Sequence, residues 1–356
     1  MFQLQFQDRL FSSLEDFTEA KPLGNPVADQ AMAFCRAWLS GKEEFQQFTS
    51  GSTGRPKEIL INRTQMKASA QATGAFFGMD EESLLCCCLH PAYIAGKMML
   101  VRAMEWNCPV ILIPPSSDPL SELAEERIPD LIAMVPLQIQ QSLQNPISLL
   151  KLKKVKQVII GGAPLSAPLK SELILNQIQA YQTYGMTETV SHIALAKIGT
   201  GELIYQTLPE VEIGVDDRQA LWVKSPMSLG EKIQTNDVVR LGSAHEFQWI
   251  GRTDFVVNSG GIKLHPERIE SKIEEAVVSH FPNARFFLKG IPDPKFGEKL
   301  VLIIESAEKN EIQANHLLSQ LTELLPPYEC PKAVYFLSVF SQTGSGKIDR
   351  NMSIPQ

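Results

Sequence analysis

The chain has 356 residues, of which 44% are hydrophobic and 21% are charged, as in ordinary globular proteins. Asp and Glu outnumber Lys and Arg by 40 to 33, which gives a formal net charge of −7. Affinity for a nucleic-acid backbone comes from clustered Lys and Arg, so this balance excludes a whole-protein nucleic-acid binder and leaves room for a local basic site. The length predicts two or three domains.

No stretch approaches the roughly 18 apolar residues that a membrane helix needs, and the first residues lack the apolar core of a signal peptide. We therefore expect no membrane span and a cytoplasmic location. The six cysteines show no CxxC spacing, and Cys86, Cys87 and Cys88 are consecutive in a strand-like run. We expect buried thiols in a reducing compartment, with neighbours in that run facing opposite sides. The sequence carries no signal for the oligomeric state.

The first half of the chain alternates short apolar runs with helical patterns, which is typical of a layered α/β architecture. In chain order, the sequence predicts a strand at 58–61, a helix at 66–77, a strand at 84–89, a helix at 94–106, strands at 109–113 and 131–135, a helix at 138–143 and a strand at 155–160. The last strand is expected to stop at Gly161-Gly162.

After about residue 199 the pattern changes to short strands with turns, at 211–215, 220–223, 237–241 and 247–250, which predicts a β-rich subdomain over about 200–250. Farther on, Pro266 can occupy the first turn of a helix whose apolar residues Ile269, Ile273 and Val277 recur every four positions. Strands at 284–288 and 300–304, a helix near 311–325 and a strand at 333–337 follow. We expect a large α/β domain at 1–253 and a small α+β domain at 254–356.

One segment has the composition of a loop that binds phosphate. Glycines let the backbone approach a ligand, hydroxyls donate to phosphate oxygens, and a lysine adds positive charge. The residues concerned are Thr49, Ser50, Gly51, Ser52, Thr53, Gly54 and Lys57. The segment is not a Walker P-loop, because Lys57 follows Pro56 and no Gly-Lys-Ser/Thr occurs there. A flexible Ser/Gly linker is the alternative, but linkers seldom lead directly into a strand.

Four motifs together resemble those of the adenylate-forming (ANL) superfamily, which comprises acyl- and aryl-CoA synthetases, luciferases and the adenylation domains of peptide synthetases. They are the segment 49–57, Tyr184-Gly185-Met186-Thr187-Glu188-Thr189, the block 251–254 followed by 260–261 and 266–270, and the segment 343–348. They occur in the family's order. The resemblance implies the ANL fold, with a large nucleotide-binding domain and a small mobile domain.

The resemblance implies that the protein activates a carboxylic acid with ATP and magnesium, giving acyl-AMP and pyrophosphate, and transfers the acyl group to the thiol of CoA. Cations must screen the two anions that meet in the first step. By resemblance, Lys347 is the catalytic lysine, Thr187 donates to the α-phosphate, and Glu188 ligates magnesium. Asp254 would be the hinge of the small domain, and Gly261 would let the pantetheine arm of CoA pass.

The remaining nucleotide contacts are carried over in the same way. The segment 49–57 would hold the β- and γ-phosphates, and Tyr184 with Gly185 would lie against the adenine. The opposite wall would be formed by Gly162, Ala163 and Pro164. Asp237 would accept the ribose hydroxyls, and Arg252 would add a second ribose contact. Plainer alternatives exist: Glu188 as a helix-start carboxylate, Asp237 as a turn residue, and Arg252 as a surface ion pair.

The chain departs from the family pattern at three places. Asn236 stands where the family commonly has glycine, although Asn tolerates left-handed backbone. Ser341-Gln342 replaces the usual Pro-Lys before the lysine motif, which removes a cation. Most family members carry a much longer region before the first motif, so the resemblance implies a shortened N-terminal region.

The continuation of the second motif, residues 184–195, resembles the o-succinylbenzoate–CoA ligase subgroup of menaquinone (vitamin K2) biosynthesis. A dicarboxylate substrate needs a cation for its second carboxylate. On the helix 94–106, Lys97 lies amid apolar residues and either lines a pocket or extends to solvent. Arg102 lies 140° away around the helix, so the two side chains cannot both face one small site.

Three further residues are candidates for the acyl pocket. His192 either lines that pocket or is a hydrogen-bonded core histidine. Tyr93 and Gly96 precede or open the helix 94–106 and would shape the pocket wall.

Three other functions remain open at this stage. The first is another aryl- or acyl-CoA ligase. The second is an enzyme that loads a carrier-protein thiol instead of CoA. The third is a non-catalytic nucleotide-binding relative. Retention of Lys347, Glu188 and Asp237 argues against the last.

Overall fold

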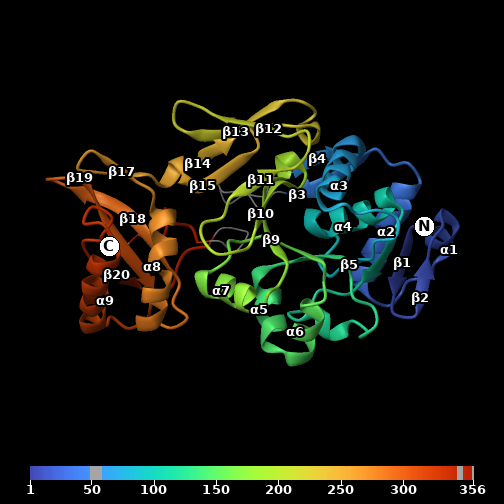
Figure 1. Ribbon diagram of the computed structural model, residues 1–356, viewed down its shortest axis with the longest axis horizontal. Helices are drawn as coiled ribbons and strands as arrows, with labels where there is room; N and C mark the ends of the chain where they lie inside the picture. The colour runs from blue at the N-terminus through green and yellow to red at the C-terminus, as the bar shows by residue number, and fades with distance from the viewer. Residues whose placement is uncertain (49–57, 343–347, 355–356) are drawn as a thin grey trace.

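The computed structural model describes residues 1–48, 58–342 and 348–354, which form a large N-terminal domain and a smaller C-terminal domain (Figure 1). The whole predicted phosphate loop, Thr49 to Lys57, and the predicted catalytic Lys347 lie outside the described residues.

The large domain contains, in chain order, β1 (Gln3–Phe6), β2 (Arg9–Phe11), α1 (Leu14–Glu19), α2 (Pro26–Leu39), β3 (Glu44–Phe48), β4 (Glu58–Asn62), α3 (Arg63–Phe77), β5 (Leu85–Cys87), α4 (Ile94–Trp106), β6 (Pro109–Leu112), β7 (Leu131–Met134), α5 (Pro136–Gln144), α6 (Pro146–Leu152), β8 (Gln157–Ile160), α7 (Ala167–Leu175), β9 (Ala180–Gly185), β10 (His192–Lys197), β11 (Tyr205–Thr207), β12 (Glu212–Val215), β13 (Ala220–Lys224), β14 (Lys232–Ser243) and β15 (Glu246–Arg252).

One 13-stranded sheet runs through the large domain in the order β12-β13-β14-β15-β11-β10-β9-β8-β7-β5-β6-β1-β2. Strands β1 and β5 to β9 are parallel to their neighbours within this set, whereas β9 to β15 are joined by antiparallel pairs. The predicted α/β half and the predicted β-rich subdomain are therefore two halves of one sheet. The predicted helices and strands of this region are confirmed, with ends that differ by a few residues.

Apolar side chains on the two faces of the parallel strands form two separate cores. One core includes residues of α2, α3 and α4, and the other includes residues of α5, α6 and α7. Cys87 belongs to the first core, whereas Cys86 and Cys88 belong to the second, which confirms the expected alternation. All six cysteines are buried and free. A parallel strand covered by helices on both faces is apolar at every position, which explains the uninterrupted cysteine run.

The small domain contains β16 (Val257–Ser259), β17 (Ile262–Leu264), α8 (Pro266–His280), β18 (Phe286–Asp293), β19 (Gly297–Glu305), α9 (Glu311–Leu324) and β20 (Val334–Leu337). Its sheet has the order β17-β16-β19-β18, and β20 pairs in parallel with β19. The predicted helix face is confirmed, because Ile269, Ile273 and Val277 are buried in the core that α8 and α9 share with this sheet. None of the described helices has the length and apolar composition that crossing a membrane requires.

The start of α4 packs directly on the chain that precedes it. A β-carbon added at Gly96 would lie 2.5 Å from the carbonyl oxygen of His90 and 2.6 Å from that of Leu89. Both obstacles are backbone atoms, so relief would require the helix to move. The position therefore fixes how closely α4 approaches β5 and the turn that follows it.

We expect Gly96→Ala to lower the free energy of unfolding by about 1–3 kcal/mol, because the added methyl group overpacks this contact. Urea unfolding followed by tryptophan fluorescence measures the change. Gly199→Ala is the matched control, since its β-carbon would meet nothing within 4 Å. Equal stability of the two variants would contradict the packing argument.

Candidate functional site

The candidate site lies where two parallel neighbours end. Strand β8 ends at Ile160 and β9 ends at Gly185, and the carboxyl ends of parallel strands in such sheets are where ligands bind. After β8 the chain turns at Gly162, whose φ of +85° favours glycine. Gly162, Ala163 and Pro164 are exposed beside this edge. This placement suits the predicted wall of a nucleotide pocket.

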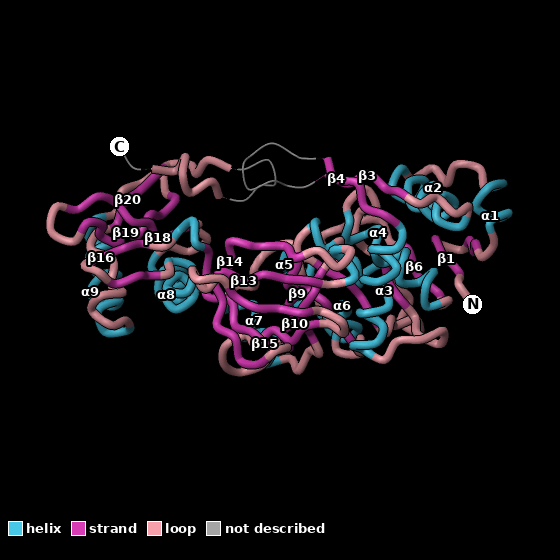
Figure 2. Tube along the Cα trace, turned by 90° about the horizontal axis from the view of Figure 1, so that it is seen from above, coloured by secondary structure: helices cyan, strands magenta, loops and turns pink. Residues whose placement is uncertain are grey.

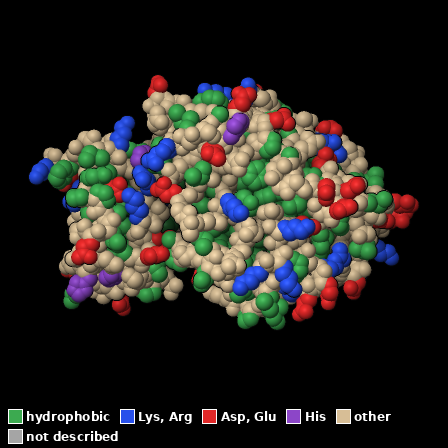
Figure 3. Space-filling model, in the orientation of Figure 1, with side chains coloured by type: hydrophobic (Ala, Val, Ile, Leu, Met, Phe, Trp, Pro, Cys, Tyr) green, Lys and Arg blue, Asp and Glu red, His purple; other side chains and the backbone are tan. Residues whose placement is uncertain are grey.

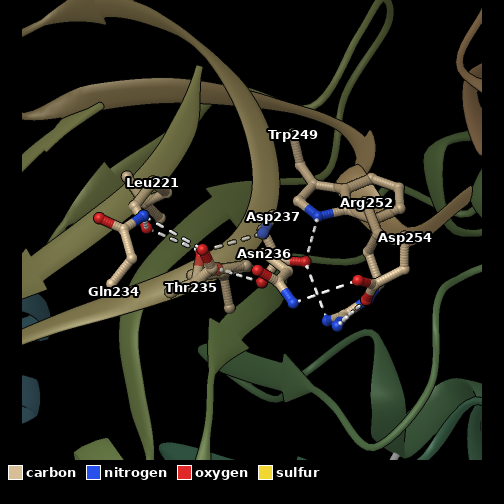
Figure 4. A network of polar contacts seen from close by, with 9 residues as sticks. Leu221, Gln234, Thr235, Asn236, Asp237, Trp249, Arg252 and Asp254 are labelled. Atoms are coloured by element: carbon tan, nitrogen blue, oxygen red, sulfur yellow. Dashed lines mark hydrogen bonds and ion pairs between the residues drawn. The ribbon is translucent and has the colours of Figure 1, made fainter. Parts of the chain in front are cut away.

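A carboxylate network occupies the same region (Figure 4). The hydroxyl of Tyr184 donates to Asp237 Oδ2 at 2.7 Å, and the indole Nε1 of Trp249 donates to Asp237 Oδ1 at 3.2 Å. Burial and the charge of Asp237 raise the pKa of Tyr184 well above its ordinary value, so the phenol stays a donor. The Thr235 hydroxyl accepts from the Asp237 amide and donates to the Leu221 carbonyl. Asp237 is thus fixed on both its backbone and its side chain.

The contact between Tyr184 and Asp237 requires a strongly curved sheet. Strands β9 and β14 are separated by β10, β11 and β15, which in a flat sheet would set them about 19 Å apart at roughly 4.8 Å per strand. The rings of Tyr184, Tyr205 and Phe247 pack against one another on the inside of the curve, with centroids 5.1 to 5.8 Å apart. The antiparallel half of the sheet therefore bends back over the end of β9.

Arg252 extends this network to the predicted hinge. Its guanidinium lies 3.6 Å from Asp237 Oδ1 and donates through Nη2 to Asp254 Oδ2 at 2.6 Å. The side-chain amide of Asn236 donates to Asp254 Oδ1 at 3.2 Å. Asn236, one of the departures from the family pattern, thus binds Asp254 directly. The ion-pair alternative for Arg252 describes its contacts in this structure, and a ribose contact stays a prediction.

The second motif forms a short turn at the end of β9. Residues Thr187–Thr189 are a single 3₁₀ turn, and the exposed Glu188 carboxylate forms no hydrogen bond or ion pair with any described residue. Within the described ranges no group of three or more His, Cys, Asp or Glu could hold a metal ion. Magnesium in nucleotide sites is commonly held by one or two carboxylates with phosphates and waters, so a single free Glu188 fits that ion.

Val190 is strained directly after this turn. Its φ of 65° and ψ of −55° are unusual for a β-branched residue, and the Ser191 amide donates to the Thr189 carbonyl at 2.7 Å. The side chain is nevertheless buried. A glycine at position 185 is also required, because its β-carbon would lie 2.5 Å from His192 Cα. These constraints together fix where Ser191 and His192 begin β10.

His192 is a buried histidine with partners on both ring nitrogens. Thr73 Oγ1 donates to the Ser69 carbonyl at 2.9 Å, so it must accept from His192 Nε2 at 3.1 Å. The hydrogen therefore sits on Nε2, and Nδ1 faces the Ser191 hydroxyl at 3.5 Å. Burial, and then the charge of Arg102, hold the pKa of His192 well below its usual range. The neutral imidazole fits the core-histidine alternative.

Arg102 is the second cation on α4, and the helix geometry predicts that it and Lys97 cannot both face one small site. Arg102 is 1% exposed, and burial lowers its pKa to about 10. Nη2 donates to Ser191 Oγ at 3.3 Å and Nη1 contacts Met99 Sδ at 3.4 Å, whereas Nε has no partner among the described residues. No described carboxylate pairs with it. A buried guanidinium without a carboxylate partner among the described residues is costly unless an anion binds there.

The other predicted pocket residues lie on or before α4. The Lys97 ammonium donates to the Gln46 carbonyl at 3.1 Å and to Gln47 Oε1 at 2.9 Å, so it binds strand β3 in this structure. Tyr93 is 67% exposed and stacks edge-on against His90. Gly96 is buried against the chain, as described above. The structure brings His192 and Arg102 together and leaves Lys97 about one and a half helical turns earlier on α4.

Gly261 lies in the small domain, in the β16–β17 turn. Its φ is +82°, and the neighbouring Gly260 amide donates to the Phe296 carbonyl at 2.9 Å. Figure 1 shows this hairpin at the outer side of the small domain, away from the large sheet.

Unpaired buried atoms gather where β15 meets the start of α8. Both oxygens of Glu267, Nδ1 of His265 and Nε of Arg268 are buried without a hydrogen-bond partner among the described residues. A β-carbon at Gly251 would lie 2.7 Å from Glu267 Oε2. Burial raises the pKa of Glu267 to about 7, against the opposing charge of Arg350.

Comparison with known proteins identifies the class to which the chain belongs. Residues 44–225 match the AMP-binding enzyme family, and residues 272–347 match the AMP-binding enzyme C-terminal domain. The chain is therefore a member of the AMP-binding enzyme family, which confirms the predicted resemblance.

Individual relatives refine this placement. The chain is 37% identical to an acyl-CoA synthetase (AMP-forming)/AMP-acid ligase II-like protein from Dyadobacter fermentans, covering 96% of this chain and 97% of that one, with a TM-score of 0.65. It is 25% identical to 2-succinylbenzoate–CoA ligase of Bacillus cereus strain Q1, over 85% of this chain and 68% of the relative. O-succinylbenzoate CoA synthetase (MenE) of Bacillus subtilis, in complex with ATP and magnesium, shares the fold at 22% identity, 86% and 69% coverage and a TM-score of 0.71.

Several residues of this region were missed from the sequence. Trp249 donates a hydrogen bond to Asp237 from the neighbouring strand. A buried indole N–H usually has a hydrogen-bond partner, which was the signal in the sequence that could have found it. Ser191 and Thr73 complete the His192 chain, but hydroxyls 118 positions apart give no pattern along a sequence.

Glu267 should make stability depend on pH. Its pKa is about 7 in the folded protein and near 4.5 in the unfolded chain, so the folded state binds more protons between these values. The free energy of unfolding therefore falls as the pH rises through this window, by about 1.4 kcal/mol for each unit of pKa difference. We expect Glu267→Gln to match the wild type below pH 4.5 and to be more stable above pH 7, as measured by urea unfolding at a series of pH values. Glu275→Gln, at an exposed position on the same helix, is the control; parallel pH curves for Glu267→Gln and wild type would refute the assignment.

Proposed function

We propose that the protein is an ATP-dependent acid–CoA ligase that forms acyl-AMP and then a thioester, with o-succinylbenzoate as the acid, as in menaquinone biosynthesis. Family membership and the names of its relatives support this proposal. The observation that carries it is the convergence of Tyr184, Asp237 and Arg252, from three different strands, at the carboxyl end of β9. An aromatic ring beside a carboxylate and a guanidinium provides the groups that an adenosine needs: a flat apolar surface, an acceptor for hydroxyls and a donor.

The proposed catalytic roles depend on how each residue would act on the negative charge of the phosphates and of the acid. Glu188 is proposed as the magnesium ligand and Thr187 as a donor to the α-phosphate. Magnesium, when bound, neutralises phosphate charge during attack by the acid. The segment from Thr49 to Lys57 is proposed to bind the β- and γ-phosphates, and Lys347 to stabilise the carboxylate and α-phosphate as they react. Residues 1–253 and 254–356 are proposed as the two domains, with Asp254 as the hinge and Gly261 as the passage for the pantetheine arm.

Arg102 favours an acid with a second negative group. Its guanidinium has an unpaired Nε and no described carboxylate partner, and it contacts Ser191, which follows the Glu188 turn. A substrate carboxylate would supply the missing counter-charge, and a monocarboxylic acid that spends its only carboxylate on AMP formation would not. This distinction supports o-succinylbenzoate over a simple aryl or acyl acid. A carrier-protein thiol as the final acceptor is the remaining alternative, and activity with free CoA separates the two.

A panel of acids tests the substrate. We expect pyrophosphate release with o-succinylbenzoate and much less with benzoate. Arg102→Met should lower kcat/KM for o-succinylbenzoate by about 100-fold, since a desolvated charge pair is lost, and leave the rate with benzoate within about threefold. The variant should keep its stability, because replacing a buried unpaired charge by an apolar side chain is often neutral or favourable.

Lys97→Met is the matched control for that experiment, with the same loss of charge on the same helix. Should Lys97→Met and not Arg102→Met remove the selectivity, Lys97 is the substrate's partner. No pyrophosphate release with o-succinylbenzoate by the wild type would refute the proposed acid.

Lys347→Ala should slow formation of acyl-AMP by about 100-fold or more, because a point charge at the reacting groups is removed. Formation of the thioester from supplied acyl-AMP and CoA should stay largely intact. Both half-reactions are measured separately, by pyrophosphate release and by CoA consumption, with Lys309→Ala at an exposed position as the control. Adenylation at the normal rate would contradict the role of this lysine.

A further inference from the structure

Helix α8 of the small domain reaches across the domain boundary to the start of α7. Glu274 Oε2 accepts a hydrogen bond from the backbone amide of Ala167 at 2.7 Å. The two helices lie next to each other in the ribbon view of Figure 1 and in the tube view of Figure 2. Figure 3 shows a notch between the two domains at the lower edge of the molecule. This contact joins residues 107 positions apart in sequence.

The contact completes the cap of α7. Ser166 Oγ accepts from the Leu169 amide, Pro168 has no N–H, and Glu274 takes the amide of Ala167. The first turn of the helix is therefore satisfied only with the help of the other domain. A carboxylate is also the favoured partner there, since the N-terminal end of a helix carries partial positive charge. Turning the small domain away would leave the Ala167 amide without this partner.

A second contact on the same helix points the same way. Arg268 Nη2 lies 3.9 Å from Glu202 Oε1, in the segment between β10 and β11. The two side chains are 36% and 59% exposed and the distance is long, so the pair adds little by itself. It shows that α8 faces the large domain along two turns.

Helix α8 also connects this boundary to the base of the lysine motif. Glu270, one turn before Glu274, forms a two-pronged ion pair with Arg350 at 2.9 and 2.7 Å. Arg350 stacks on Phe255, the residue after Asp254, with 4.9 Å between the guanidinium carbon and the ring centre. Helix α7, for its part, follows directly on the loop of Gly162, Ala163 and Pro164. The contact at Ala167 thus links the small domain, which carries the lysine motif, to the helix that follows the loop of Gly162, Ala163 and Pro164.

We propose that Glu274 is a latch that holds the small domain in the orientation for adenylate formation and must release Ala167 before CoA can react. We assign the observed orientation to adenylate formation because the turn that contains Gly261 lies on the outer side of the small domain. In that place it does not line a passage for CoA into the large domain. This inference rests on the proposed two-step ligase reaction. Release and capture of the latch then accompany each turnover.

The first test measures domain orientation without any substrate. Spin labels at Leu150→Cys and Ile312→Cys, which replace residues 62% and 74% exposed in the two domains, report the interdomain distance. The six native cysteines are buried, so labelling is selective. We expect one dominant distance for the parent and a ratio of latched to unlatched molecules about three- to tenfold lower for Glu274→Ala. Glu275→Gln, the exposed neighbour, should leave the distribution unchanged. An unchanged distribution for Glu274→Ala would overturn the latch.

The second test compares the two half-reactions. Glu274→Ala should slow acyl-AMP formation modestly and speed thioester formation from supplied acyl-AMP by about threefold, because the population shifts from one orientation to the other. General damage to the fold would lower both rates. Changes of the same sign would therefore overturn the proposal. If the wild type forms no acyl-AMP from any acid, the proposed function fails, and the distance measurement still decides whether the latch exists.

Discussion

The Asp237 carboxylate is the interaction on which the geometry of the candidate site depends. It accepts hydrogen bonds from Tyr184 on β9 and Trp249 on β15 and faces the guanidinium of Arg252. The first of these contacts can form only because the antiparallel strands bend back over the end of β9. Removing the carboxylate would leave the phenol of Tyr184 and the indole of Trp249 without this acceptor, so the curvature and the charge stabilise each other.

The two sides of the site differ in how completely their charges are paired. Around Asp237 each charge has partners, whereas Arg102 is buried without a carboxylate and Glu188 is exposed without a cation among the described residues. A folded protein tolerates such groups where a ligand supplies the missing charge, because preorganised charges need no rearrangement when the ligand arrives. The strained Val190 lies in sequence between Glu188 and Ser191, the residue that Arg102 contacts, and it fixes the turn that separates them. The imbalance therefore coincides with the part of the site that we propose to bind anions and metal.

Local patterns were sufficient to predict many of the helices and strands, although α2, α7 and β9 were not among them. The contacts between distant segments could not be predicted. The α8 face of Ile269, Ile273 and Val277 and the alternation of Cys86, Cys87 and Cys88 follow from helix and strand periodicity, and both are confirmed. The choice between Lys97 and Arg102 could not be made this way. Both lie on one helix, and which of them is buried depends on what β3 and β10 place against it. The ordering of β9 to β15 in one curved sheet could not be predicted either, because the two groups of neighbouring strands are joined by β11 and β15, which are distant in sequence.

The contacts around Asp254 suit the hinge that we propose there. Arg252 and Asn236 both bind its carboxylate, and both contacts are exposed to solvent. Exposed pairs contribute about 0–1 kcal/mol each, so these two together favour the observed orientation by at most about 2 kcal/mol. A glycine at position 236, as is common in the family, would have no amide to donate. Asn236 therefore makes the observed orientation somewhat more stable in this chain, and the energy remains small enough for substrate binding to reverse it.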